Sequence, residues 1–353
     1  MNTFKQLFGK FEFIPTSTAW YIAELSEARG KQELFTRQTP QKLKALREHA
    51  MIESAISSNR IEGVNIDQSR VNTVVFGKKP TLDRNEEEVR GYRNALKWIH
   101  ENYAGIPLTE KTIRELHRLS RGDIWDAGRY KDKDGDIIEK YPDGRTRVRF
   151  KTVTAKATPA ALTQLTEAWN NSLREQKIHP LIAVAAYNLD FLCIHPFRDG
   201  NGRVSRLLLL LQTLKLGYAV GHYISLERTI EENKERYYET LEQSSQRWHE
   251  AKHDPWPYIN YLLSILRQAY RELEDRVEWT KSPRGTKTEQ IFRAIDTFSG
   301  TFTLQDIQRA CMGTSPDMVR KVLRDLQRLG SVECLGRGPG AKWRKKGTTL
   351  KRG

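Results

Sequence analysis

The 353-residue chain has only three cysteines, at positions 193, 311 and 334, and they lie far apart. This spacing excludes a disulfide framework and a cysteine-rich zinc cluster, and the eight histidines show no metal-ligand spacing either. The longest apolar run, residues 207–211, is far too short to span a bilayer, and the first residues lack the apolar core of a signal peptide. We therefore expect a cytoplasmic protein with no membrane partner.

Internal repeats and low-complexity tracts are also absent, while the length allows two or three domains. Positive charge is unevenly distributed. Residues 281–353 hold sixteen Lys and Arg against six Asp and Glu, which is +10 of the chain's net charge of +15. Residues 280–286 combine charge with Ser, Pro and Gly, as linkers do. The sequence thus predicts a basic C-terminal domain behind a larger N-terminal part.

The most informative segment is residues 195–206, HPFRDGNGRVSR. Gly200 and Gly202 allow positive φ and close approach of the backbone, so the amides around Asn201 can form a concave anion site. The apolar pattern that follows predicts a buried helix, and the N-terminus of a helix attracts anions. A phosphate group is therefore expected at this point of the chain.

The charged residues of the segment extend this prediction. Arg203 and Arg206 are three residues apart, hence on one helical face, and guanidinium groups bind phosphate oxygens bidentately. Asp199 is a hard oxygen ligand of the kind that Mg²⁺ takes once or twice per site. His195 is the group that accepts a proton near neutral pH. Each feature alone has an ordinary structural interpretation, but together they predict a site for a metal-bound polyphosphate beside a general base.

The segment matches every fixed position of HPFx(D/E)GNGRxxR, the signature of the Fic (filamentation induced by cAMP) family, and the chain therefore resembles that family. The resemblance implies a mainly α fold with a helical-bundle core. It implies a nucleotidyltransferase that moves AMP from ATP to a Ser, Thr or Tyr hydroxyl of a target protein, or of itself, with release of pyrophosphate. By the same resemblance His195 is the general base, and Asp199 holds Mg²⁺ at the α and β phosphates. Asn201 and the amides of Gly200 and Gly202 then form the anion hole.

Arg203 and Arg206 resemble the clamps on the β and γ phosphates, and Phe197 resembles the residue that anchors the loop in the core.

Upstream, residues 40–62 have a helical apolar spacing that ends before Gly63. The helix dipole disfavours an anion in the last turn, so Glu62 is expected to have another partner.

Residues 58–63, SNRIEG, resemble the (S/T)xxxE(G/N) inhibitory motif of Fic proteins. This resemblance implies that Ser58 and Glu62 belong to an inhibitory helix. In such relatives the glutamate pairs with the second arginine of the signature, here Arg206, and prevents the productive pose of the γ phosphate.

Residues 137–140 and 147–150 predict two short strands around an Asp-Gly turn. In position this hairpin, residues 137–150, corresponds to the flap on which Fic relatives dock the target protein by strand pairing, with an ordinary surface hairpin as the alternative. Beyond the signature, Asn233, Tyr237 and Tyr238 fall where relatives pack residues near the adenine. A core or interface role for the two tyrosines is an equal alternative.

In the basic C-terminal part, helices are expected at residues 289–298, 304–311 and 316–329, followed by a hairpin of residues 331–335 and 341–344. This order resembles a winged helix-turn-helix, whose third helix enters the major groove while its wing touches phosphates. The basic residues expected on that helix and wing are Arg320, Lys321, Arg324, Arg337, Lys342 and Arg344. They favour double-stranded DNA as a partner, with a protein-interaction module as the alternative.

We therefore expect a helical region at residues 1–84 that carries the inhibitory helix, a catalytic core at residues 85–279, and a winged helix at residues 285–348. The expected activity is that of an autoinhibited protein adenylyltransferase that uses ATP and Mg²⁺. A homodimer is compatible with the sequence, although no coiled-coil pattern demands it. The alternative is a DNA-binding transcriptional regulator whose core senses nucleotide or removes AMP from modified proteins. The intact His195 favours catalysis over sensing alone.

Overall fold

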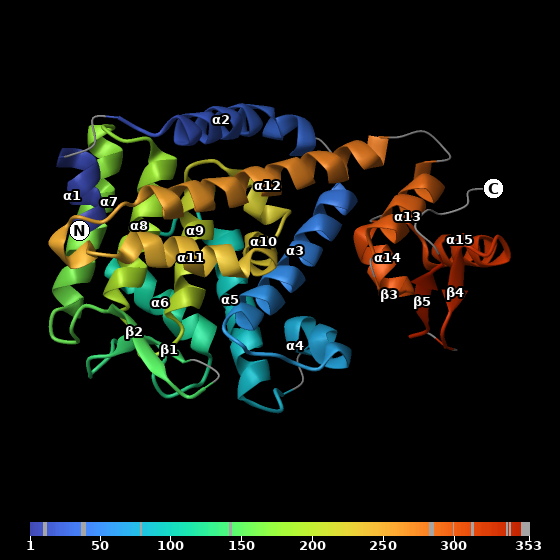
Figure 1. Cartoon of the computed structure of the whole chain (residues 1–353), viewed down its shortest axis with the longest axis horizontal. Helices are drawn as coiled ribbons and strands as arrows, with labels where there is room; N and C mark the ends of the chain where they lie inside the picture. The colour runs from blue at the N-terminus through green and yellow to red at the C-terminus, as the bar shows by residue number, and fades with distance from the viewer. Residues whose placement is uncertain are drawn as a thin grey trace. The chain divides into compact units, whose positions relative to one another are not determined.

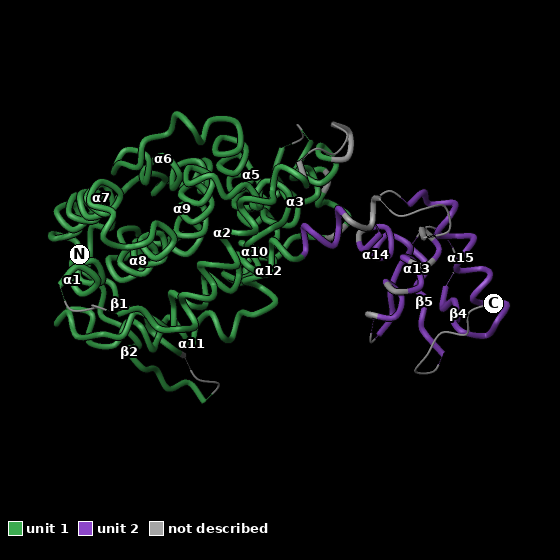
Figure 2. Tube along the Cα trace, turned by 90° about the horizontal axis from the view of Figure 1, so that it is seen from above, with its two compact units in different colours: residues 1–271 green, residues 272–353 purple. Residues whose placement is uncertain are grey.

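Helices make up most of the protein, for which we analysed a computed structural model (Figure 1). It describes residues 1–353 except 10–12, 37–39, 78–79, 141–142, 282–285, 299, 312–313, 337, 339 and 347–353. The chain separates into two compact units, Met1–Arg271 and Glu272–Gly353, which Figure 2 colours separately. The mainly α fold class expected from the sequence is confirmed. In the described ranges, no helix combines the length and the apolar character needed to cross a membrane.

Two central helices of the larger unit, α8 (Pro180–Ile194) and α9 (Asn201–Lys215), carry the signature loop between them. Every residue of α8 after Pro180 is buried, as is every residue of α9 except Gly202 and Lys215. A helix that is apolar on all sides has to be enclosed on all sides. The pair packs together, so the loop at residues 195–200 is held by the core rather than by the surface.

Other helices enclose this pair, with α7 packed on α8, α6 on α9, and α5 on α3, α6 and α9. The helices before the pair are α1 (Asn2–Gly9), α2 (Thr16–Thr36), α3 (Pro40–Ile61), α4 (Val71–Phe76), α5 (Arg84–Asn102), α6 (Glu110–Arg121) and α7 (Thr158–Glu175). Those after it are α10 (Leu226–Glu232), α11 (Lys234–Ser245) and α12 (Trp256–Lys281), with short 3₁₀ turns at Gln68–Arg70, Ala219–His222 and Trp248–Glu250.

Helix ends follow the local sequence. The side chain of Thr109 caps α6, because its hydroxyl accepts the amide of Thr112 at 3.3 Å. Helix α3 ends at Ile61, and Gly63 follows with a φ of +82°, the conformation in which glycine commonly terminates a helix. The predicted helix of residues 40–62 is therefore present, with Glu62 just beyond its last turn.

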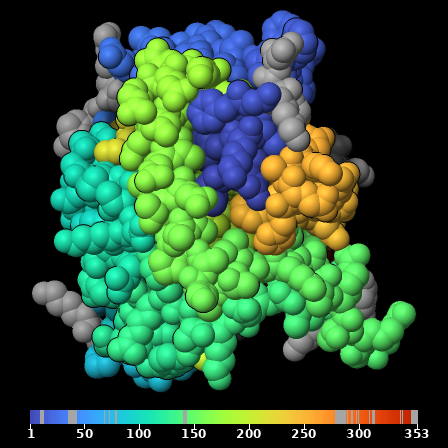
Figure 3. Space-filling model, turned by 90° about the vertical axis from the view of Figure 1, so that its left-hand side faces the viewer, coloured from blue at the N-terminus to red at the C-terminus, as the bar shows by residue number. Residues whose placement is uncertain are grey.

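Helix α1 is fastened to the core by buried polar groups. The Thr3 hydroxyl donates to Asp190 Oδ1 at 2.7 Å, and Asn2 Nδ2 donates to the carbonyl of Trp248 at 2.8 Å. In Figure 3 this helix, dark blue, is set into the surface beside the orange segment. Since Asp190 lies on α8 shortly before His195, the first helix braces the one that leads into the signature loop.

The hairpin predicted at residues 137–150 consists of β1 (Asp136–Lys140) and β2 (Thr146–Lys151), which pair antiparallel. Ile138 lies opposite Val148, and both are about half exposed, at 53% and 49%. Part of the expected turn, residues 141–142, lies outside the described residues, whereas Gly144 has a φ of +85°. The two strands form a sheet of their own.

The smaller unit contains α13 (Thr286–Thr297), α14 (Leu304–Ala310) and α15 (Pro316–Arg328), close to the three predicted helices. Ser315 caps α15 through the amide of Met318 at 3.2 Å, and Pro316 occupies the first position of the helix. The three-stranded sheet has the order β3 (Thr301–Thr303), β5 (Lys342–Lys345), β4 (Val332–Cys334). Strand β3 was not predicted, because three residues are too few to show a period. The interdomain linker expected at residues 280–286 falls mostly outside the described residues.

Candidate active site

His195 ends α8 in a left-handed conformation, with a φ of +52°. Its backbone N–H still donates to the carbonyl of Phe191 at 2.9 Å, and the chain then leaves the helix axis. The ring Nδ1 lies 3.3 Å from the carbonyl of Leu192, and because a carbonyl can only accept, Nδ1 carries the proton. Nε2 therefore keeps its lone pair, as a general base requires.

The surroundings of His195 keep its ring neutral. Its pKa is lowered to about 4, chiefly by burial and also by the positive charge of Lys131. Lys131 Nζ donates to the carbonyl of Ile194 at 3.1 Å and to Thr152 Oγ1 at 2.8 Å. The imidazole can thus accept a proton at neutral pH. No local sequence pattern indicated a role for Lys131, because only the tertiary structure brings it close to His195.

His117 holds the middle of the signature loop from α6. Its ring stacks on Phe197, with the centroids 3.8 Å apart and the planes at 3°. Its Nδ1 accepts the amide of Gly128 at 2.9 Å, so Nε2 carries the proton and donates to the carbonyl of Asp199 at 3.0 Å. Phe197 is buried, in keeping with its expected role as an anchor. His117 itself was missed, since one histidine on a helix gives no signal.

The Asn201 side chain is engaged within the loop. Its Oδ1 accepts the amide of Phe197 at 2.9 Å, and its Nδ2 donates to the carbonyl of the same residue at 2.8 Å. The buried amide therefore fixes the shape of the loop. Asn201 also begins α9, so its contribution to an anion site comes from the free backbone N–H groups of that helix end.

Gly200 and Gly202 are needed in the loop for two different geometric reasons. Gly200 has a φ of +82° at the start of α9. At Gly202 a Cβ atom would overlap Oε1 of Glu62. The carboxylate of Glu62 thus lies against the first turn of α9, which is where the helix dipole and the unpaired N–H groups favour an anion.

Arg206 connects α9 with the end of α3. Its Nε donates to Ser58 Oγ at 2.8 Å, and its Nη2 donates to the Ser58 carbonyl at 2.9 Å and to Glu62 Oε1 at 2.8 Å. Nη1 is buried, close to Gly202, and has no hydrogen-bond partner among the described residues. Burial lowers the pKa of Arg206, but Glu62 outweighs this effect and the pKa lies above its ordinary value. A charged guanidinium with an unpaired buried donor suits an incoming anion.

Arg203 extends from α9 toward α5 and is almost fully buried. Its Nη1 donates to Glu88 Oε2 at 2.7 Å and to Asn59 Oδ1 at 3.3 Å. Its Nη2 lies 3.4 Å from Asp199 Oδ1. Of its two terminal nitrogens, only Nη2 faces the loop, so any contact with a phosphate has to be made on that side.

Asp199 is the half-exposed carboxylate of the loop. Its Oδ2 accepts from Arg84 at 3.0 Å and from Arg121 at 2.9 Å, and its Oδ1 accepts the amide of Gly200 at 2.6 Å. Burial raises the pKa of Asp199, but the guanidinium groups of Arg203 and Arg121 lower it more, so the pKa lies below its ordinary value. The carboxylate is therefore ionised at neutral pH. Arg84 and Arg121 come from α5 and α6 and were not selected from the sequence.

A cavity of about 260 Å³ opens beside His195, with Glu62 and Gly202 in its wall. Strands β1 and β2 contribute to another part of the wall, and α11 contributes Tyr237 and Tyr238. Tyr237 is buried, with its ring 5.8 Å from that of Tyr261, so it belongs to the core and to the cavity at once.

Asn233, which was expected beside these tyrosines, does not line this cavity. Its Nδ2 donates to the carbonyl of Thr229 at 2.9 Å, and it lines a separate cavity between α2, the start of α11 and α12. The structure therefore divides the three residues expected near an adenine between two cavities.

Residues 107–213 match the Fic/DOC family. That segment is therefore similar to the Fic/DOC family. It includes α6, the hairpin, α7, α8 and α9 as far as residue 213, and hence the whole signature loop. Among curated proteins, the chain is 30% identical over 185 residues to "Protein adenylyltransferase Fic" of Drosophila grimshawi and 29% identical to the protein of that name of Drosophila melanogaster. The match covers 50% of this chain and 35% of each relative, so the chain spans about one third of their length.

Solved structures show the same fold. A Fic family protein from Desulfovibrio desulfuricans G20 has a TM-score of 0.61 and 24% identity, over 96% of this chain and 98% of that one. A Fic domain containing signaling protein from Bacteroides thetaiotaomicron VPI-5482 also has a TM-score of 0.61 and 24% identity, over 72% of this chain and 97% of that one. At this level of identity the similarity establishes only the fold of the chain.

The metal expected with Asp199 can be tested against the donor set. No group of three or more acidic, histidine or cysteine side chains is gathered around a metal position in the part of the chain that the structure describes. An ionised, half-exposed aspartate beside an anion site nevertheless suits Mg²⁺, which takes one or two carboxylates and completes its shell with phosphates and water. The residues present therefore fit a Mg²⁺ that arrives with a polyphosphate.

Five of the six basic residues predicted to bind DNA are described, and all five are on the surface of the C-terminal unit. Arg320, Lys321 and Arg324 are exposed on α15, and Lys342 and Arg344 are exposed on β5. Arg320 pairs with Asp317 at 2.8 Å. Arg344 pairs with Glu333, so part of its charge is already neutralised. Arg337 lies outside the described residues.

Proposed function

We propose that this chain is a Fic-family protein adenylyltransferase that transfers AMP from ATP to a hydroxyl side chain of a target protein. The observation that carries this proposal is the arrangement of one neutral imidazole and one anion site in the same loop. His195 Nε2 is free to accept a proton, and the first turn of α9 with Arg206 offers donors to a phosphate. The activity named for the Drosophila relatives supports the same assignment.

In the proposed reaction, the target hydroxyl attacks the α phosphorus and gives its proton to His195 Nε2. The bond between the α phosphorus and the bridging oxygen breaks, and pyrophosphate leaves with the electron pair. Arg206, the α9 amides and Nη2 of Arg203 stabilise the charge on the phosphate oxygens. When bound, Mg²⁺ held by Asp199 would neutralise phosphate charge, while the protein positions the reacting groups.

The target protein would bind at the hairpin of β1 and β2. This proposal is supported by its place at the cavity beside His195 and by the exposed pair Ile138 and Val148. A two-stranded sheet has outer edges whose backbone groups can pair with an extended segment. Such pairing would bring a target hydroxyl to the cavity without requiring a particular target sequence.

We also propose that Glu62 inhibits the site. Its carboxylate occupies the first turn of α9 and the Nη2 donor of Arg206, which are the groups that a phosphate needs. A γ phosphate and Glu62 would therefore compete for one guanidinium. Ser58 supports this state, because its hydroxyl and its carbonyl hold the same arginine.

The activity is tested with α-³²P-labelled ATP, Mg²⁺ and a cell lysate, followed by separation of the labelled proteins. Replacement of His195 by Ala should remove the transfer of label, by roughly 10²-fold or more, while nucleotide binding measured by equilibrium dialysis is retained. Equal labelling by the two proteins would contradict the proposed base. Removal of AMP from previously labelled protein, without new labelling, would instead support the alternative of a de-AMPylating core.

For the C-terminal unit we propose a winged helix that binds double-stranded DNA. The support is the face of α15 that carries Arg320, Lys321 and Arg324, opposite the buried Val319 and Leu323. A helix with a basic exposed face and an apolar inner face can lie along phosphates without unfolding. The hairpin of β4 and β5 adds Lys342 on the wing side.

A further inference from the structure

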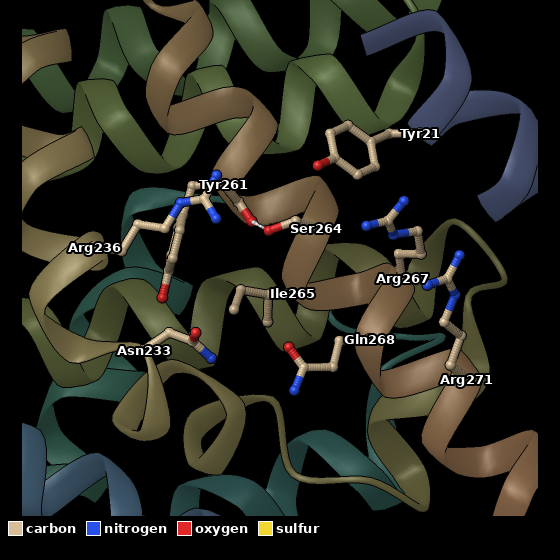
Figure 4. Close-up of a pocket in the computed structure, with 9 residues that line it drawn as sticks. All are labelled: Tyr21, Asn233, Arg236, Tyr261, Ser264, Ile265, Arg267, Gln268 and Arg271. Atoms are coloured by element: carbon tan, nitrogen blue, oxygen red, sulfur yellow. Dashed lines mark hydrogen bonds between the residues drawn. The ribbon is translucent and has the colours of Figure 1, made fainter. Parts of the chain in front are cut away.

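The larger unit has a second cavity, of about 270 Å³, between α2, the start of α11 and α12 (Figure 4). It shares no lining residue with the cavity beside His195. The two are nevertheless adjacent, because Tyr261 lines one, Tyr237 lines the other, and their rings lie 5.8 Å apart. The proposed adenylyltransferase reaction has no use for this second cavity.

The charge of this second cavity is strongly positive. Three of its lining residues are arginines, Arg236, Arg267 and Arg271, and none of the lining residues is acidic. Glu24, on the neighbouring α2, pairs with Arg267 at 3.4 Å and with Arg271 at 3.2 Å. Arg236 forms no ion pair with any residue that the structure describes. One carboxylate therefore faces three guanidinium groups.

The arginines approach the cavity from different sides. In Figure 4, Asn233 and Arg236 lie on one side of the view, and Arg267 and Arg271 lie on the other. Arg267 is held over the ring of Tyr21 at 4.7 Å, a contact that orients its guanidinium. Cations that reach one cavity from separate helices can contact an anion from more than one side, unlike a charged strip along a single helix.

The wall also contains an unused hydrogen-bonding group. Tyr261 is only 1% exposed, and its hydroxyl has no hydrogen-bond partner among the described residues. Buried hydroxyls in folded proteins nearly always have a partner, so a lone one at a cavity wall indicates that a partner comes from outside the chain. The hydroxyl end of Tyr261 is directed toward Asn233 in Figure 4, which adds an amide to the same region.

We propose that this second cavity binds a small oligophosphate anion. Guanidinium groups bind phosphate oxygens bidentately, and an anion of two or more phosphates would neutralise the excess charge left by Glu24. The volume is slightly below the roughly 300 Å³ at which typical small-molecule sites begin, which suits a compact anion. Arg236 would bind one phosphate group and Arg267 with Arg271 the other, with the Tyr261 hydroxyl as a further donor.

The test is equilibrium dialysis of the full chain with ³²P-labelled pyrophosphate at low ionic strength. Because the site beside His195 is also proposed to bind phosphate, the measurement starts from Arg206→Met, which removes the guanidinium of that site. We expect this variant to retain one bound pyrophosphate per chain, and Arg236→Ala with Arg267→Ala in the same background to weaken its binding at least tenfold. The control pair Arg118→Ala with Arg174→Ala removes two exposed arginines elsewhere on the unit and should leave binding unchanged.

Two results would overturn the proposal. One is loss of all pyrophosphate binding in a folded Arg206→Met variant, as judged by an unchanged melting temperature. The other is binding that survives the loss of both Arg236 and Arg267. Should Arg206→Met fail to fold, the stoichiometry in the otherwise unaltered chain decides. It should fall by one pyrophosphate per chain when Arg236 and Arg267 are replaced, and an unchanged stoichiometry contradicts the site.

Discussion

Glu88 and Asp199 share the same three arginines. Glu88 accepts from Arg84 at 3.1 Å, from Arg121 at 2.7 Å and from Arg203 at 2.7 Å. Asp199 accepts from Arg84 at 3.0 Å, from Arg121 at 2.9 Å and from Arg203 at 3.4 Å. The carboxylate of the signature loop is therefore positioned by α5 and α6, and Glu88 is the buried counter-charge that holds the arginines in place.

Replacing Glu88 by Gln should destabilise the protein strongly. The glutamate side chain is 2% exposed, and its removal leaves the buried charge of Arg203 without its main partner. Breaking a buried ion pair in this way costs about 3–5 kcal/mol of unfolding free energy. Urea titration of the larger unit's unfolding transition, followed by circular dichroism, measures the change. Glu101→Gln, at an exposed pair with Lys97, is the control and should cost less than about 1 kcal/mol.

Replacing Glu62 by Gly should increase AMP transfer. The substitution frees Nη2 of Arg206 and the first turn of α9, and release of a competing pair worth about 1.4 kcal/mol raises the rate roughly tenfold. Helix α3 should remain in place, because Ser54 is hydrogen-bonded to Glu227 at 2.6 Å. Initial rates of label incorporation from α-³²P-labelled ATP give the comparison.

The matched control for Glu62 is Glu48→Ala, which removes an exposed carboxylate from the same helix and should leave the rate unchanged. A rate that stays constant or falls in Glu62→Gly, with the control intact, contradicts autoinhibition by this residue. A gain in both variants would point to a general effect of charge instead.

Replacing Lys131 by Met should move the acid limb of the pH–rate profile to higher pH. The pKa of His195 is lowered to about 4 by burial and by the Lys131 charge, and the reaction needs the neutral ring. Without that charge the pKa of His195 rises, so protonation stops the reaction at a higher pH than in the unaltered protein, by up to about one unit. Lys133→Met, an exposed neighbour, is the control. A uniform loss of rate without a shift of the acid limb would indicate that Lys131 supports the structure of the loop and does not set the pKa of His195.

The full chain should bind duplex DNA in a salt-dependent manner. Fluorescence anisotropy with a labelled duplex between 50 and 300 mM salt, roughly the range over which phosphate contacts dominate affinity, gives the slope of log affinity against log salt. Joint replacement of Arg320, Lys321 and Arg324 by Ala should reduce that slope by about one for each side chain that neutralises a DNA phosphate. Arg118→Ala with Arg174→Ala serves as the control for removal of positive charge elsewhere. Absence of salt-sensitive binding to any duplex would exclude the DNA function and favour a protein partner.

Local features were predicted well because they depend on neighbouring residues. The helix of residues 40–62 ends next to Gly63, and the Asp-Gly turn lies between the two predicted strands. In each case the deciding interaction reaches only a few residues along the chain. Strand β3 was missed because it is short and pairs with β5, which is distant in sequence.

The site itself was predictable only in part. The signature indicated which side chains take part, and the resemblance of residues 58–63 named Glu62 as the partner of Arg206. The sequence could not show that the Asn201 side-chain amide is hydrogen-bonded to the backbone of Phe197, or that Arg203 is paired with Glu88. Nor could it separate Asn233 from Tyr237, since both are compatible with the same helical segment.

The sequence by itself determined which reactive groups the site has: one imidazole, one carboxylate, a glycine-rich turn and two arginines at fixed spacing. It also placed most of the net positive charge in residues 281–353. The tertiary structure decided the protonation of these groups and the partners with which they pair. It buried His195 beside Lys131, which keeps the ring neutral, and it placed Glu62 against α9, where an anion is favoured. Chemical type is fixed by covalent structure, whereas pKa and pairing depend on desolvation and on groups brought together across the fold.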